Sequence, residues 1–173
     1  SDACNYDENA LVDDGSCTGP YLCEDGDTLV CDLNECPIVL PDYFPIDWDT
    51  DFDGILDNYN DYQYNGSVTS TVFLDEVNMV SEMDLLASFV NGEQRGVAQS
   101  LEVEFGPYEG TFQFLMMIYS NESDGEELTF QFYDYETDTI YELDETVDWM
   151  IDMVIGNVVD PQIFNVSLGI DIE

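Results

Sequence analysis

Hydrophobic and polar residues alternate along the chain from about residue 62 onward. The runs Leu101-Glu102-Val103-Glu104-Phe105 and Leu128-Thr129-Phe130-Gln131-Phe132 change polarity at every residue, which is the period-two pattern of a half-buried strand. Residues 111–119 are apolar at successive positions near their middle, as expected for a central strand buried on both faces. Residues 147–154 fit either a helix or a strand, and their length favours a strand. The second half of the chain is therefore predicted to be a β-sheet.

Turn residues separate these runs at short intervals. Asn91-Gly92 predicts a two-residue hairpin turn, because both central positions of such a turn have a positive φ. Ser123-Asp124-Gly125 and Glu136-Thr137-Asp138 predict further hairpins. Strands joined by hairpins predict an antiparallel β-sandwich over residues 62–163.

The C-terminal segment 164–173 has the most regular alternation in the chain. Two interpretations stay open: the segment is the last strand of its own sheet, or it is a donor strand that completes the sheet of a neighbouring subunit. Donation is a head-to-tail contact, so it would join copies of this chain into an open filament. The apolar positions predicted to make this subunit contact are Phe164, Val166, Leu168, Ile170 and Ile172.

All the cysteines lie in the N-terminal segment, which we take as a head spanning residues 1–46. Clustered cysteines in a stretch rich in loop-forming residues are typical of a disulfide-linked head in an oxidising compartment. A metal site of cysteine thiolates is the weaker alternative, and the odd number leaves one cysteine without an intramolecular partner. The candidates for disulfides are Cys4, Cys17, Cys23, Cys31 and Cys36.

Residues 47–61 form an Asp-rich segment with the ligand spacing of an EF-hand calcium loop. Asp49, Asp51 and Asp53 fall at loop positions 1, 3 and 5, and Gly54 at position 6 allows the sharp turn. Position 12, normally a bidentate acid, is an Asn, and an adjacent or preceding Asp can complete the shell. The alternative is a solvated acidic linker. The predicted calcium ligands are Asp47, Asp49, Asp51, Asp53, the carbonyl of Ile55, Asp57, Asn60 and Asp61.

Charge excludes several classes of function. The chain has 40 acidic residues against one basic residue, Arg95, and no histidine, for a formal net charge of -39. A protein that binds nucleic acid or an anionic membrane needs a basic surface, which this chain lacks. No apolar run approaches the roughly 20 residues of a membrane-spanning helix. A hydrophobic content of 45% indicates a folded chain, whose self-repulsion calls for bound cations or a high-salt environment.

Three segments resemble known families. Ala3–Ala10 together with Asp13–Cys17 resembles short Cys-containing repeats of secreted bacterial proteins, and residues 47–61 resemble thrombospondin type 3 calcium repeats, which coil around ions without flanking helices. Residues 66–164, with Leu85–Ala98, Ile118–Asn121 and Ile140–Glu145, resemble a β-sandwich module of secreted bacterial proteins. These resemblances imply an extracellular, generally non-catalytic protein.

The expected fold is therefore mainly β, an antiparallel β-sandwich preceded by a small, irregular, disulfide-rich and calcium-binding head. The expected function is that of an extracellular or cell-surface structural protein stabilised by calcium, which assembles into a filament or an adhesive stalk. A ligand- or carbohydrate-binding module of a larger secreted protein is the alternative. A carboxylate hydrolase would rest only on the abundance of acids, so no catalytic residue is predicted.

Overall fold

The computed structural model describes residues 21–22, 29–30 and 46–167, and the chain divides into two compact units, Ser1–Phe44 and Pro45–Glu173. In the first unit, strands β1 (Tyr21–Leu22) and β2 (Leu29–Val30) pair antiparallel. The predicted disulfide cysteines lie outside the described residues.

The second unit, called the body below, is a β-structure with one short 3-10 helix, η2 (Tyr59–Asp61), at its beginning. Its strands are β3 (Tyr64–Leu74), β4 (Val77–Asn78), β5 (Leu85–Val90), β6 (Glu93–Glu102), β7 (Phe112–Ser120), β8 (Asp124–Asp134), β9 (Thr139–Glu142), β10 (Val147–Met150), β11 (Val154–Ile155) and β12 (Gln162–Asn165). The prediction of a mainly β fold is confirmed.

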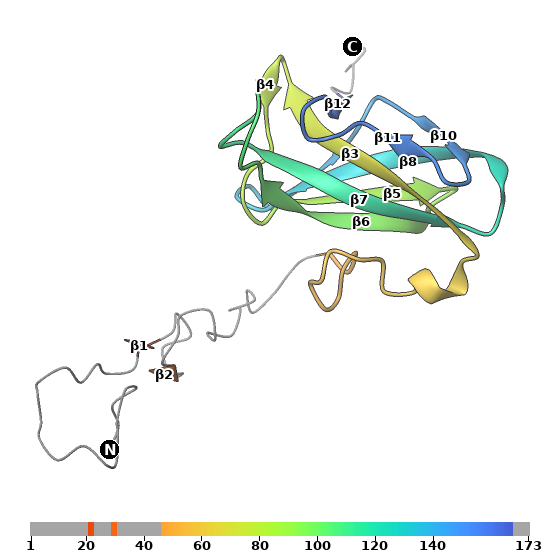
Figure 1. Ribbon diagram of the computed structural model, residues 1–173, viewed down its shortest axis with the longest axis horizontal. Coiled ribbons are helices and arrows are strands. Elements are labelled where there is room, and N and C mark those ends of the chain that lie inside the picture. The colour runs from red at the N-terminus through yellow and green to blue at the C-terminus, as the bar shows by residue number, and fades with distance from the viewer. Residues whose placement is uncertain (1–20, 23–28, 31–45, 168–173) are drawn as a thin grey trace, which may run out of the picture. The chain divides into compact units, whose positions relative to one another are not determined.

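The strands of the body form one curled sheet (Figure 1), in the order β10-β8-β5-β6-β7-β3-β11, with β9 beside β8 and with β4 and β12 beside β3. The long strand β6 connects the two halves, since Gln99 pairs with Leu85 of β5 and Ser100 pairs with Phe114 of β7. Most pairs are antiparallel, as predicted. Strands β11 and β12 differ, because both run parallel to β3.

The two edges of the curled sheet meet beyond β12. Leu143 forms an antiparallel bridge with Val166, and the Ser167 N–H donates to the Glu142 carbonyl at 2.8 Å. The Glu145 carboxylate accepts from both the backbone N–H and the side-chain amide of Asn165, each at 2.6 Å. These contacts satisfy polar groups that an open edge would expose to pairing with another chain.

The core lies inside the curl and follows the alternation of the sequence. Leu128, Phe130 and Phe132 of β8 point inward and are at most 1% exposed, as the period-two pattern predicts. Gly96 of β6 is required at one close approach, because a Cβ there would lie 2.4 Å from the Met117 carbonyl oxygen. The core comprises Val68, Val72, Val80, Leu86, Val90, Ala98, Phe114, Met116, Ile118, Leu128, Phe130, Phe132, Leu143, Val147, Trp149, Met153, Phe164 and Val166.

Two of the three predicted hairpins are confirmed. Asn91 and Gly92 have φ of 51° and 82° and join β5 to β6, and residues 136–138 join β8 to β9. The hairpin at 123–125 is wrong, because β7 lies between β6 and β3 whereas β8 pairs with β5. The residues at 123–125 allow the chain to reverse direction, but a local turn does not determine that the next strand pairs with the preceding one. The ambiguous segment after residue 146 contains strand β10.

The segment predicted as a C-terminal strand begins inside the body. Strand β12 pairs with β3, Phe164 is fully buried and Val166 is 5% exposed. Leu168, Ile170 and Ile172 lie outside the described residues. Two of the five proposed contact residues thus pack in the core of their own subunit.

Candidate metal centre

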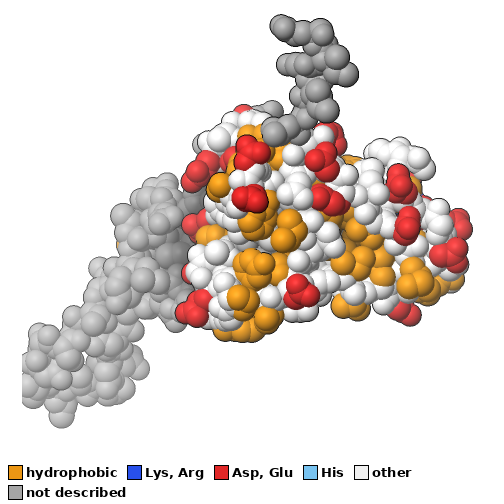
Figure 2. Space-filling view, turned by 90° about the horizontal axis from the view of Figure 1, so that it is seen from above, with side chains coloured by type: hydrophobic (Ala, Val, Ile, Leu, Met, Phe, Trp, Pro, Cys, Tyr) orange, Lys and Arg blue, Asp and Glu red, His pale blue; other side chains and the backbone are white. Residues whose placement is uncertain are grey.

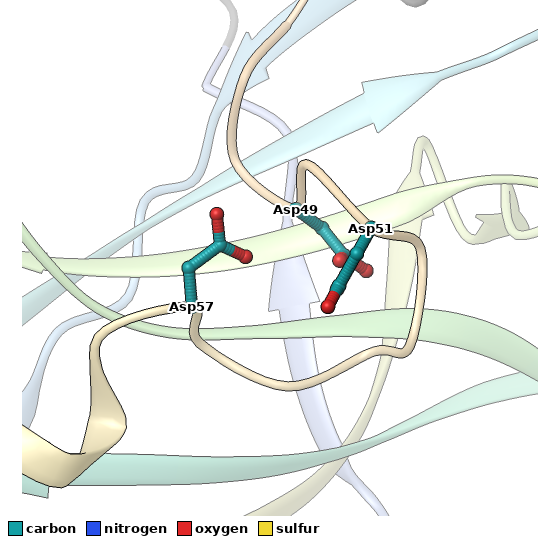
Figure 3. A group of neighbouring side chains, drawn as sticks. All are labelled: Asp49, Asp51 and Asp57. Carbon is teal, nitrogen blue, oxygen red and sulfur yellow. The ribbon is translucent and has the colours of Figure 1, made fainter.

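The Asp-rich segment folds into a loop that gathers three carboxylates. One oxygen each of Asp49, Asp51 and Asp57 lies within 4.8 Å of the others. Figure 3 shows Asp49 and Asp51 side by side, with Asp57 across the loop. Two oxygens that each lie about 2.5 Å from one calcium ion can be at most about 5 Å apart. The spacing of the three carboxylates therefore fits a shared cation.

Asp49 is the buried member of this group, at 1% exposure. Its oxygens accept from the backbone N–H groups of Asp53 at 3.2 Å and Gly54 at 2.8 Å. Positive φ values of 58° at Phe52 and 75° at Gly54 turn the chain so that these groups face the carboxylate. Burial raises the pKa of Asp49, although these hydrogen bonds oppose the shift. A cation beside this carboxylate would favour its charged form.

Asp51 and Asp57 are exposed to solvent. The Asp57 carboxylate also accepts hydrogen bonds from the backbone N–H and the hydroxyl of Thr50, which connect the two ends of the loop. Three carboxylates this close repel one another by about 1 kcal/mol per pair even in a water-like medium. A divalent cation would replace this repulsion with attraction.

The other predicted carboxylate ligands do not join this group. Asp47 and Asp61 are exposed and outside it, and Asp61 lies in η2 with Asn60. Asp53 uses one carboxylate oxygen to accept from the Ile55 N–H at 2.8 Å. The structure thus brings together three of the predicted side-chain ligands.

The loop is fixed to the outer face of β6 by two glutamine side chains. The Gln99 amide donates to the Phe52 carbonyl at 2.7 Å and to the Asp49 carboxylate at 3.4 Å. The Gln94 amide donates to the Trp48 carbonyl at 2.8 Å. Sequence reasoning missed both glutamines, because they lie far along the chain from the loop and carry no motif of their own.

Residues 46–61 also cover an apolar area of the sheet. Leu85 and Ala87 of β5 and Val97 of β6 are at most 1% exposed, yet they do not belong to the core inside the curl. Trp48 and Leu56 of the loop are themselves buried, and the Trp48 ring meets the Phe89 ring of β5 edge-on at 5.8 Å. We therefore refer to residues 46–61 as the cover loop. Figure 1 shows it beneath β6.

A cluster of tyrosines begins at the end of the cover loop, with Tyr59. The Tyr119 ring of β7 lies 5.7 Å from the Tyr59 ring and 6.4 Å from the Tyr62 ring, measured between centroids. The Arg95 guanidinium lies 5.1 Å above the Tyr62 ring and pairs with Glu126 at 2.9 Å. Arg95 thus connects the tyrosine cluster to a carboxylate of β8.

Comparison with protein-family models, with curated proteins and with solved structures finds no match. Within the part of the chain that the structure describes, no helix has the length and apolar character needed to cross a membrane.

Proposed function

We propose that this protein is an extracellular structural module stabilised by calcium bound in the cover loop. The observation that carries the proposal is the group of Asp49, Asp51 and Asp57, whose oxygens lie within 4.8 Å of one another on a loop fixed to the sheet. Carboxylate oxygens are the ligands that calcium prefers, and calcium tolerates an irregular shell completed by carbonyls and water.

The position of the loop gives the ion a structural role. The Gln99 amide donates to both the Asp49 carboxylate and the Phe52 carbonyl. An ion held by Asp49 would therefore be connected to β6 through the Gln99 side chain. Trp48 and Leu56, on the same loop, close over the apolar area of β5 and β6. An ion that stabilises the loop therefore stabilises the body.

Titration calorimetry and thermal unfolding test this proposal. At a calcium concentration about a hundredfold above Kd, binding stabilises the folded state by about 2.7 kcal/mol. The double variant Asp51→Asn/Asp57→Asn is expected to lose both the binding heat and the stabilisation. Asp148→Asn is the matched control, because Asp148 is an exposed carboxylate on β10. Equal stabilisation by sodium chloride at the same ionic strength would instead indicate general screening of a highly acidic surface.

Assembly by strand donation is a separate prediction within this proposal. Because Phe164 is fully buried beside β3 in its own subunit, donation requires β12 to leave its own sheet and to be replaced by the strand of another copy. Deletion of 164–173 is expected to abolish filaments, and an added peptide of this sequence is expected to fill the vacated position. Filaments that persist after the deletion would contradict donation.

Binding of a cell-surface or glycan ligand is the alternative function. It is favoured by the tyrosine cluster, in which Tyr59 is 42% exposed. A titration with neutral oligosaccharides that perturbs the Tyr59 and Tyr119 ring signals would support it.

A further inference from the structure

The outer face of β7 carries an apolar and aromatic row that the cover loop contacts at its aromatic end, through Tyr59, and that is exposed at Leu115 and Met117. Leu115 is 48% exposed and Met117 is 38% exposed, whereas the intervening Met116 is 1% exposed and points into the core. Tyr119 continues the row on the same face and contacts the ring of Tyr59. We call Leu115, Met117, Tyr119 and Tyr59 the β7 strip.

The neighbours of the strip make it a defined surface. On β3, small polar residues stand opposite it, with Ser67 paired to Met117 and Thr69 paired to Leu115. The Tyr62 ring lies 6.4 Å from the Tyr119 ring and its hydroxyl contacts the Glu93 carboxylate, so a carboxylate lies near the aromatic end. The strip is thus apolar along its length and has acidic groups near its aromatic end.

The aromatic end already receives a cation from within the chain. Arg95 lies over the Tyr62 ring, and the Tyr62 hydroxyl donates to the Glu93 carboxylate at 2.9 Å. Cation–π attraction and a nearby carboxylate act together there. Tyr59, at 42% exposure, presents an aromatic ring at the same cluster to solvent.

The charge of the protein determines the chemistry of a partner for this surface. The chain has 40 acidic residues and one basic residue, and the face seen in Figure 2 shows acidic side chains in red among hydrophobic ones in orange, with no blue. A second copy of this chain cannot supply a cation, because Arg95 is 8% exposed and already paired with Glu126.

We propose that the β7 strip is a docking surface for an extended segment of a different protein in which basic and apolar residues alternate. Apolar side chains of the segment pack on Leu115 and Met117. A Lys or Arg of the segment stacks on Tyr59 and faces the surrounding carboxylates. The apolar part of this contact, on Leu115 and Met117, involves none of the carboxylates grouped in the cover loop.

A binding experiment with two peptides tests the surface. The probes are ten-residue peptides of alternating Lys and Leu and of alternating Lys and Ser, titrated into the full chain by fluorescence anisotropy. The two peptides carry the same charge and differ only in their apolar side chains. The Lys-Leu peptide is expected to bind about tenfold more tightly, because only its Leu side chains can pack on the strip. The double variant Leu115→Ser/Met117→Ser is expected to remove that difference. The control Val77→Ser/Ile140→Ser changes residues of similar exposure, 62% and 48%, on β4 and β9.

Methionine oxidation provides a second readout that needs no variant. Dilute peroxide is expected to oxidise Met117 and Met150, which are 38% and 58% exposed, and to spare Met116 at 1%. The Lys-Leu peptide is expected to protect Met117 alone, because Met150 lies on β10.

Five results would overturn the inference. Equal affinity for both peptides, or an unchanged preference in the Leu115→Ser/Met117→Ser variant, would show non-specific attraction to an acidic protein. Resistance of Met117 to peroxide in the free full chain would show that another part of the chain covers the strip. Self-association that the same variant abolishes in sedimentation would assign the strip to a second copy. Tight binding of a neutral oligosaccharide that protects Met117 would assign it to glycans.

Discussion

The outer surface of the curled sheet has two apolar areas that differ in solvent exposure. On β5 and β6, Leu85, Ala87 and Val97 are buried although they point away from the core. On β7, Leu115 and Met117 also point away from the core and are 48% and 38% exposed. The cover loop packs on the first area through Trp48. At the second area it contacts Tyr119 through Tyr59 and leaves Leu115 and Met117 exposed.

The comparison shows that covering an apolar face requires polar complementarity as well. Trp48 and Leu56 provide the apolar side of the cover loop, but its backbone carbonyls must also find donors. Gln94 and Gln99 supply those donors from β6. Opposite Met117 and Leu115, strand β3 offers the small side chains of Ser67 and Thr69, which provide no comparable long donors.

The comparison also assigns two roles to one segment. Trp48 and Leu56 face the sheet, whereas Asp51 and Asp57 face solvent beside the buried Asp49. Because both sets belong to one short loop, a cation bound on the solvent side would be thermodynamically linked to packing on the sheet side. Leu115 and Met117 of the β7 strip remain exposed beside this loop.

The largest expected effect comes from removing the aromatic side of the cover loop. Trp48 is 8% exposed and contacts Phe89, so Trp48→Ala is expected to lower the free energy of unfolding by about 3–5 kcal/mol. Urea unfolding measures the loss. Val154→Ala, at a site 79% exposed, is the control and should stay within about 0.5 kcal/mol of the parent. A loss of similar size in both variants would contradict the role of the loop as a cover.

A pH-dependent effect of intermediate size is expected from Asp84, which precedes β5. This carboxylate is fully buried and accepts from the backbone N–H groups of Ser81 at 2.7 Å and Tyr135 at 2.9 Å. Burial raises its pKa from 3.8 to about 6. The folded state therefore holds the proton more tightly, and the stability that this group contributes below pH 3.8 is lost as the pH rises toward and through 6. The loss amounts to about 3 kcal/mol.

The measurement is the free energy of unfolding between pH 4 and pH 7, compared with that of Asp84→Asn at the same calcium concentration. The variant cannot ionise at this position. Its free energy of unfolding is therefore expected to fall by about 3 kcal/mol less than that of the parent as the pH rises. Parallel curves for the two proteins would contradict the assignment to Asp84.

Local sequence signals predicted the parts of the fold that depend on neighbouring residues. Alternation of polar and apolar residues identified β8. Asn91-Gly92 identified the hairpin between β5 and β6, and the Asp spacing identified the three carboxylates of the cover loop. Each of these features is determined within a few residues, where backbone preference and side-chain period act directly.

Features that depend on distant contacts were not predictable in this way. The pairing of β12 with β3 in parallel and the hydrogen bonds of Gln99 to the cover loop join segments far apart in the chain. The apolar run at 111–119 predicted burial on both faces, and the structure leaves Leu115 and Met117 exposed. Alternation reports how apolar each face is, but it does not report whether another segment covers that face.

A smaller effect is expected at the glutamines that hold the cover loop. Gln99→Ala removes a donor to the Phe52 carbonyl at 2.7 Å and to Asp49 at 3.4 Å, at a cost of about 1–2 kcal/mol. Gln94→Ala removes one bond to the Trp48 carbonyl and is the matched variant. Of the two glutamines, Gln99 is the one that contacts a carboxylate of the candidate metal group, so only Gln99→Ala is expected to weaken calcium affinity in calorimetry. Equal affinities in the two variants would show that the ion and β6 are not connected through Gln99.

The smallest expected effect on stability lies at the uncovered strip. Leu115→Ser replaces a side chain that is 48% exposed, so the free energy of unfolding is expected to change by no more than about 0.5 kcal/mol. The adjacent Met116 on the same strand is 1% exposed, and Met116→Ala is expected to cost about 2–5 kcal/mol. Urea unfolding of the two variants therefore compares the two faces of β7 one residue apart. A large loss in Leu115→Ser would mean that another part of the chain packs on the strip, and it would remove the distinction between the covered and the uncovered face.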